Sequence, residues 1–126
     1  MKLAIVGTST YEDIEECFRI LDLLRTGIEI TSVVSGGAKG ADRMAELWCE
    51  HHGIPILVLP ADWNKYGKGA GFIRNKDIWD NADFGVAFWD GESKGTAHSF
   101  NIARKQEKEL FIFNYMSKKF YKNEEK

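Results

Sequence analysis

The stretch with the clearest chemical potential is a glycine-rich turn within residues 32–46, SVVSGGAKGADRMAE. An apolar strand pattern leads into this turn and an amphipathic helix pattern leaves it. Glycine lacks a Cβ, so the backbone of such a turn can approach a ligand closely. The unpaired N–H groups of a helix's first turn favour an anion there. The pattern therefore predicts a phosphate site built from Ser35, Gly36, Gly37, Ala38, Lys39, Gly40 and Asp42.

The turn matches neither the Walker A motif nor the dinucleotide fingerprint, so a tight connection without a ligand remains the alternative. Two more loops rich in Gly, Ser and Thr strengthen the prediction of a pocket, because they follow two other apolar strand patterns. Their candidate ligand-binding residues are Gly7, Thr8, Ser9, Asp90, Gly91, Ser93, Gly95 and Thr96.

Strand and helix patterns alternate along the chain, as expected for a parallel sheet with helices on both faces. The strands are predicted at residues 2–6, 30–34, 56–59, 84–89 and 110–114, and residues 61–71 are predicted as a long polar and aromatic loop. The fold class is therefore α/β, doubly wound and Rossmann-like, with a mostly parallel sheet of about five strands. Residues 1–115 are expected to form one domain, followed by a lysine-rich tail or frayed helix over residues 116–126.

The composition sets the broad class of the protein. With 126 residues and a net charge of −2, the chain lacks the basic surface of many nucleic-acid-binding proteins. Cys17 and Cys49 fall on apolar helix faces and are expected to be buried free thiols, and no zinc or other metal site is predicted. No apolar run is long enough to span a membrane and no leader pattern precedes the first strand, so a cytoplasmic protein is expected.

Five segments occur in a recognisable order: GTS at 7–9, VSGGAKGAD at 34–42, PADW at 60–63, GKGAGFIRN at 67–75 and AFWDGESKGT at 87–96. Together they resemble the YspA-like branch of the SLOG superfamily, over residues 2 to about 114. The superfamily also contains the Lonely Guy phosphoribohydrolases and the DNA-processing protein A family. The resemblance implies a ligand derived from a nucleotide, such as an ADP-ribose-like molecule or a nucleotide sugar. The first loop of this branch usually reads Gly-Ser-Arg, so Gly7-Thr8-Ser9 lacks its cation.

The comparison with the Lonely Guy motifs bears on catalysis. Their arginine aligns with Arg74, beside Asn75, and the position of their catalytic glutamate is Ser99. A serine hydroxyl is a poor substitute for the carboxylate that N-glycosidic hydrolysis needs. Asp90 is the remaining catalytic candidate, with capping of a turn or contact with a ribose as its alternatives. Binding is therefore favoured over catalysis, with Arg74 pairing with phosphate or, alternatively, forming a surface ion pair.

Trp63 and Tyr66 are candidates for stacking on a base, whereas Trp79 is expected in the core or at a subunit contact. The leading hypothesis is a sensor or sequestering module for a phosphorylated small molecule, as a homo-oligomer and without a further cofactor. A phosphoribohydrolase-like enzyme is the first alternative. Binding of single-stranded DNA is the second, suggested by the resemblance of residues 34–42 to the DNA-processing family. The net charge and the small size argue against nucleic acid as a partner.

Overall fold

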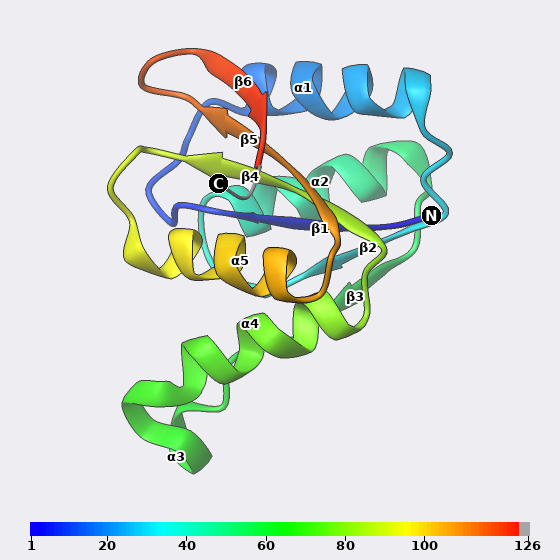
Figure 1. Cartoon of the computed structure of the whole chain (residues 1–126). Helices are drawn as coiled ribbons and strands as arrows, with labels where there is room; N and C mark the ends of the chain where they lie inside the picture. Colours follow the sequence, from blue (N-terminus) through cyan, green and yellow to red (C-terminus); the bar gives the residue numbers. More distant parts are fainter. Residues whose placement is uncertain (124–126) are drawn as a thin grey trace.

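A six-stranded sheet in the order β3-β2-β1-β4-β5-β6 forms the centre of the computed structural model, which describes residues 1–123 (Figure 1). The neighbouring strands from β3 to β5 are parallel, and β6 is antiparallel to β5. The chain crosses from β3 at one edge to β4 beside β1, so the strand order reverses between β1 and β4. The strands are β1 (Lys2–Gly7), β2 (Ser32–Ser35), β3 (Ile56–Val58), β4 (Phe84–Trp89), β5 (Glu109–Asn114) and β6 (Lys119–Lys122).

Helices cover both faces of the sheet, with α1 and α2 on one face and α4 and α5 on the other (Figure 1). The short helix α3 lies beyond α4, away from the sheet. This arrangement confirms the predicted doubly wound α/β fold. The helices are α1 (Ile14–Gly27), α2 (Ala41–His52), α3 (Trp63–Tyr66), α4 (Ala70–Asp80) and α5 (Lys94–Lys105), and a 3-10 turn, η1, spans Gly67–Gly69.

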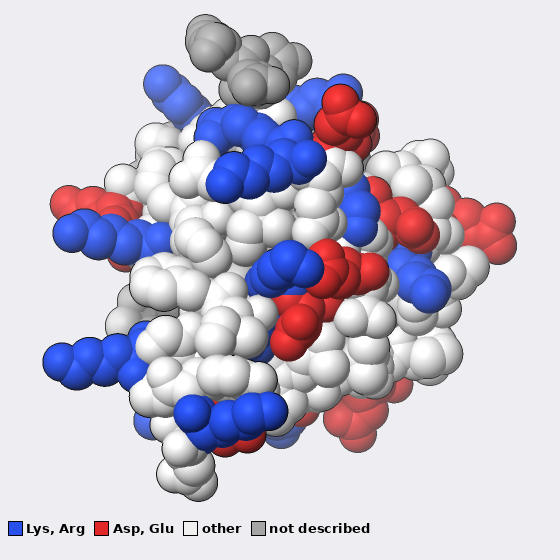
Figure 2. Space-filling view, turned by 60° about the horizontal axis from the view of Figure 1, so that its bottom comes forward, with Lys and Arg blue, Asp and Glu red and all other residues white. Residues whose placement is uncertain are grey.

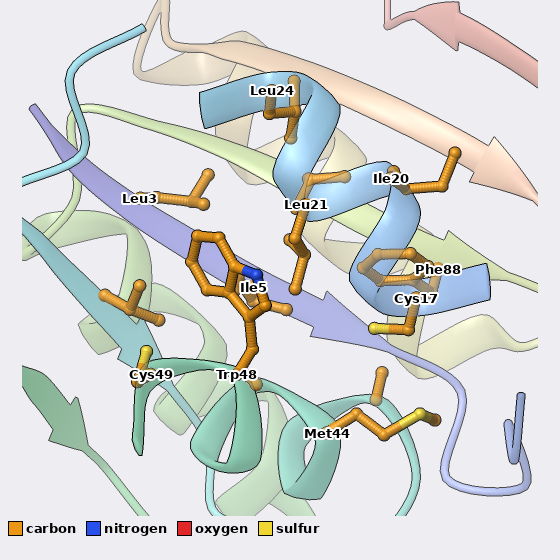
Figure 3. Packing of buried hydrophobic residues seen from close by; sticks show 14 of the residues in the cluster. Leu3, Ile5, Cys17, Ile20, Leu21, Leu24, Met44, Trp48, Cys49 and Phe88 are labelled. Carbon is orange, nitrogen blue, oxygen red and sulfur yellow. The ribbon is translucent and has the colours of Figure 1, made fainter. Parts of the chain in front are cut away.

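The larger core packs α1 and α2 against β1 (Figure 3). Leu21 of α1 and Trp48 of α2 are fully buried, and the Trp48 indole Nε1 donates to Asp22 Oδ1 at 2.9 Å. The two predicted buried thiols are confirmed. Burial raises the pKa of Cys17 to about 12 and that of Cys49 to about 11, so both thiols stay protonated and unreactive at neutral pH.

The second core lies under α4 and α5. Trp79 is fully buried there, which confirms the core alternative for this residue. Its indole lies directly over Gly85 of β4, where a Cβ would overlap the ring. This contact anchors α4 to the sheet. It thereby fixes the helix that carries Arg74 and Asn75.

Two segments differ from the sequence predictions. The sequence predicts a loop over residues 61–71, but residues 63–69 form α3 and η1 and residues 70–71 begin α4. The Asp62 side chain accepts the Lys65 N–H at 3.0 Å and starts the short helix α3. The predicted tail contains β6, in which Phe120 pairs with Phe113 of β5. Lys118, just before β6, reaches back to Glu16 of α1 at 2.7 Å. The rest of the predicted tail, residues 124–126, lies outside the described residues. Within residues 1–123, no helix has the length and apolarity to cross a membrane.

Candidate functional site

A cleft of about 300 Å³ lies at the carboxyl end of β1, against the first turns of α2, α4 and α5. This is the place where the strand order reverses and where ligands bind in such folds. The cleft brings together ten of the predicted site residues. They are Gly7, Ser9, Ala38, Asp42, Trp63, Arg74, Asn75, Ser93, Gly95 and Thr96.

The other predicted residues lie around the cleft without lining it. They are Thr8, Ser35, Gly36, Gly37, Lys39, Gly40, Tyr66, Asp90 and Gly91. Among the residues that do line the cleft, Gly7 lies in close contact with its neighbours, because a Cβ there would lie 2.6 Å from both the Ala41 side chain and the Phe88 carbonyl. The glycine therefore lets α2 pack against the sheet at the floor of the site.

Protein atoms pack tightly against the glycine-rich turn. Gly37 and Gly40 have φ angles of 71° and 70°, which only glycine adopts without strain. A Cβ on Gly36 would overlap the guanidinium of Arg74, and one on Gly40 would overlap the Thr8 carbonyl. Other atoms therefore do approach the backbone of this turn closely, as the sequence predicts, but they are atoms of the protein and not of a ligand.

A carboxylate already occupies the predicted anion site. Asp42, which is 6% exposed, accepts the Ala38 N–H through Oδ2 at 3.1 Å. Burial raises the pKa of Asp42, while the Ala38 N–H and the Arg74 charge act in the opposite direction. The Ala41 N–H donates to the Thr8 carbonyl at 3.4 Å. An incoming phosphate would have to compete with these internal acceptors.

In the loop after β4, N–H groups also donate to a side chain of the protein. Asp90 Oδ1 accepts the N–H groups of Glu92 at 2.8 Å and Ser93 at 2.7 Å, and these bonds lower its pKa. The Thr96 N–H donates to the Ser93 hydroxyl at 3.4 Å. Asp90 therefore caps the turn, as in the structural alternative, and is absent from the cleft lining. The carboxylate that lines the cleft is that of Asp42.

Arg74 forms one wall of the cleft. Its Nη1 donates to the Gly36 carbonyl at 2.7 Å, and its Nε donates to Asn75 Oδ1 at 3.2 Å. Asn75 Nδ2 in turn donates to the Gly95 carbonyl at 3.3 Å and lies 3.2 Å from His98 Nδ1. The two residues of α4 thus connect the glycine-rich turn with the start of α5. The guanidinium faces the cleft and is held by a neutral carbonyl.

Exposed aromatic side chains stand at the cleft beside a lysine. Trp63 is 60% exposed and Phe72 is 51% exposed, and both line the cleft together with Lys68. The Phe72 ring meets the His98 imidazole edge to face, with centroids 4.6 Å apart. Tyr66 stands just outside the lining, with Lys65 Nζ 5.0 Å from its ring centroid. Burial, with the Lys105 charge, lowers the pKa of His98, which is therefore neutral at neutral pH.

Sequence reasoning missed Phe72, Lys68 and the ligand-facing position of Ser99. The sequence pattern gave no signal for Phe72, because it lies seven residues before Trp79, at the spacing of the buried stripe of α4, and is nevertheless 51% exposed. Figure 2, which brings the lower side of Figure 1 forward, shows separate basic groups between wide uncharged areas. That view contains no continuous basic stripe.

Comparisons with known proteins identify the family of the chain. The model of the YspA, cpYpsA-related SLOG family matches residues 1–66, which confirms the resemblance seen in the five sequence segments. The Gene 61 protein of Mycobacterium phage D29 is 39% identical over 79 residues, which cover 58% of this chain and 63% of the phage protein. The chain thus spans less than two thirds of that relative's length.

A solved structure of DNA processing protein A from Helicobacter pylori shares the fold. It has a TM-score of 0.66 at 21% identity, and the match covers 89% of this chain and 64% of that one. That structure describes a single-stranded DNA binding mode of its own protein.

This comparison overturns two sequence-based expectations. The main hypothesis, a nucleotide-derived small molecule as ligand, is wrong, and so is the argument against nucleic acid as a partner. Both followed from features that do not decide the question. Net charge describes the whole surface and not one cleft, and in the turns expected to hold a phosphate the N–H groups of Ala38, Glu92 and Ser93 already donate to Asp42 and Asp90. The expected homo-oligomer stays a prediction.

Proposed function

The chain belongs to the YspA, cpYpsA-related SLOG family, and from that premise we propose that its cleft binds single-stranded DNA. The observation that carries the proposal is the combination, in one cleft, of two exposed aromatic rings with two cations. The rings are those of Trp63 and Phe72, and the cations are Lys68 and Arg74. The single-stranded DNA binding described for the similar solved structure supports the proposal.

The aromatic rings explain a preference for unpaired bases. Every base has a π-face, so stacking on an aromatic side chain is tolerant of sequence and contributes about 1–3 kcal/mol per base. In a duplex these faces are covered by neighbouring bases. Trp63 has much of its surface free because α3, all four residues of which are exposed, holds it away from the sheet.

The cations provide the contacts with phosphate. Asp42 and Asp90 already accept the N–H groups of Ala38, Glu92 and Ser93 in the two glycine-containing loops, so we assign the contacts with phosphate to side chains. Lys68 lies at the cleft, and Arg74 has Nη2 donors beyond the bonds made by Nη1 and Nε. Two cations give a modest electrostatic contribution, consistent with the scattered basic groups in Figure 2.

Fluorescence anisotropy with a labelled oligothymidylate of about twelve nucleotides tests the proposal. We expect saturable binding that is at least about tenfold weaker for the matching duplex, because its bases are already stacked. The logarithm of the binding constant is expected to fall with the logarithm of salt concentration with a slope of about −1.4, as two phosphate contacts to a single strand require. Failure to bind, or equal binding of the duplex, would refute the proposal.

A further inference from the structure

We infer that the cleft accepts one unstacked base of the strand and prefers guanine, because Asp42 and Arg74 present a carboxylate and a guanidinium side by side. This inference rests on the proposed function. It adds a base preference to what would otherwise be binding without regard to sequence.

The position that a Cβ on Gly36 would take shows how close the two groups lie to one another. A Cβ placed on Gly36 would lie 2.7 Å from Arg74 Cζ and 3.0 Å from Asp42 Oδ2. Both groups therefore border the same point, and both line the cleft. A planar group that enters the cleft meets an acceptor and a donor next to each other.

The size and floor of the cleft suit a base. A volume of about 300 Å³ is at the lower end of the range for ligand pockets. Its lining includes two buried apolar side chains, Val6 at 6% exposure and Ile78 at 1%. Such a floor suits the flat apolar face of a base better than it suits a charged phosphate.

A buried hydroxyl supplies a second, independent observation. Ser99 is 1% exposed and lines the cleft, so its hydroxyl is a polar group in an otherwise largely apolar floor. A base edge has donors and acceptors that this hydroxyl can meet in either sense.

The order of donors and acceptors selects among the bases. The Watson–Crick edge of guanine presents two adjacent N–H donors and then the O6 acceptor. An ionised carboxylate accepts both donors, and a neighbouring guanidinium donates to O6. Adenine and cytosine each place a ring acceptor beside their single amino group, and thymine has only one N–H donor. These three bases leave part of the Asp42–Arg74 pair unmatched.

The same pair argues against phosphate at this point. Asp42 repels a second anion close to Gly36, whereas Lys68 does not. The strand's phosphates therefore lie toward the rim with Lys68 and one free N–H of Arg74, and the base lies inward with Asp42 and another N–H of Arg74. Asp42 keeps its bond from Ala38, because a carboxylate has about four lone-pair positions.

Anisotropy titrations with four strands test the inference. Each is an oligothymidylate whose central nucleotide is thymidine, adenosine, inosine or guanosine. We expect the guanosine strand to bind about tenfold more tightly than the thymidine strand. Inosine, which lacks the N2 amino group, should lose most of that gain although it stacks as a purine. In Asp42→Asn the ratio between the guanosine and thymidine strands should fall to about one. The matched control Glu50→Gln, on the exposed side of the same helix, should keep the ratio.

The outcomes separate the two proposals. Equal binding of all four strands by the wild-type protein overturns the guanine preference and leaves single-stranded binding in place. A guanosine gain that inosine or Asp42→Asn retains also overturns the role of the Asp42 carboxylate. Because the strand series is measured on the wild-type protein, it decides the base preference even if a variant fails to fold. If none of the four strands binds, the proposed function itself fails.

Discussion

Removal of the Trp63 indole tests how far aromatic stacking drives binding. The side chain is 60% exposed, and its Cη2 lies 3.5 Å from the place that a Cβ on Gly71 would take. It therefore contributes little to the core. We expect Trp63→Ala to change the free energy of unfolding by no more than about 0.5 kcal/mol. The loss of one base–aromatic stack, about 1–3 kcal/mol, corresponds to a binding constant weaker by about fivefold to about 150-fold.

The assay pairs anisotropy titrations of a labelled oligothymidylate with urea unfolding of the same protein samples. Trp63→Phe keeps a ring and is expected to recover most of the affinity. Leu23→Ala removes an exposed apolar side chain from α1, on the other face of the sheet, and should bind as the wild type does. A folded Trp63→Ala protein that binds within about twofold of wild type would refute the stacking argument.

Three further predictions concern residues of the two glycine-containing loops. Gly36→Ala places a methyl group against the Arg74 guanidinium and breaks its bond to the Gly36 carbonyl. Because the displaced Arg74 loses its contact with the strand, and a bond to a charged group contributes about 1.5–3 kcal/mol, we expect at least about tenfold weaker oligonucleotide binding, with Gly27→Ala, where a Cβ meets nothing within 4 Å, as the unaffected control. The raised pKa of Asp42 means that its contribution to stability declines as pH rises from the unfolded pKa, near 4, through the folded value. In urea unfolding, Asp42→Asn should therefore gain stability relative to wild type across that window and then level off, and a constant difference would contradict the assigned shift. The pKa of Asp90 is lowered, so its stabilisation is present above the unfolded pKa and disappears as pH falls through the folded value. Asp90→Ala should be less stable than wild type by about 1 kcal/mol at neutral pH and by less in acid, and an unchanged unfolding midpoint at neutral pH would show that the cap contributes nothing.

Much of the fold could be predicted because the signals are local. Apolar runs such as residues 84–89 and the stripe that carries Trp48 identify buried strands and helices directly. The four residues of β6 are all exposed and pair antiparallel with β5, so their composition resembles that of a tail. The helix α3 has only four residues, too few for a periodic pattern.

Ten of the residues predicted for the site line one cleft, but the contacts within the loops could not be predicted from the sequence. Glycine positions show where the backbone comes close to something, and the structure shows that at Gly36 the neighbour is Arg74. Whether loop amides are free for a phosphate depends on the side chains of Asp42 and Asp90, and a sequence cannot distinguish a capping aspartate from one that holds a ribose. The importance of Phe72 depends on its exposure, which becomes visible only once α4 is packed.

Photocrosslinking tests the central claim most directly, because it reports both binding and its location. Oligothymidylate that carries iododeoxyuridine is irradiated with the wild-type protein, and the adducts are mapped by mass spectrometry of peptides. We predict adducts on the segment of residues 63–74, at Trp63 or Phe72, and their loss when unlabelled single strand competes. Adducts confined to α1 or β6, or none at saturating protein, would contradict the account.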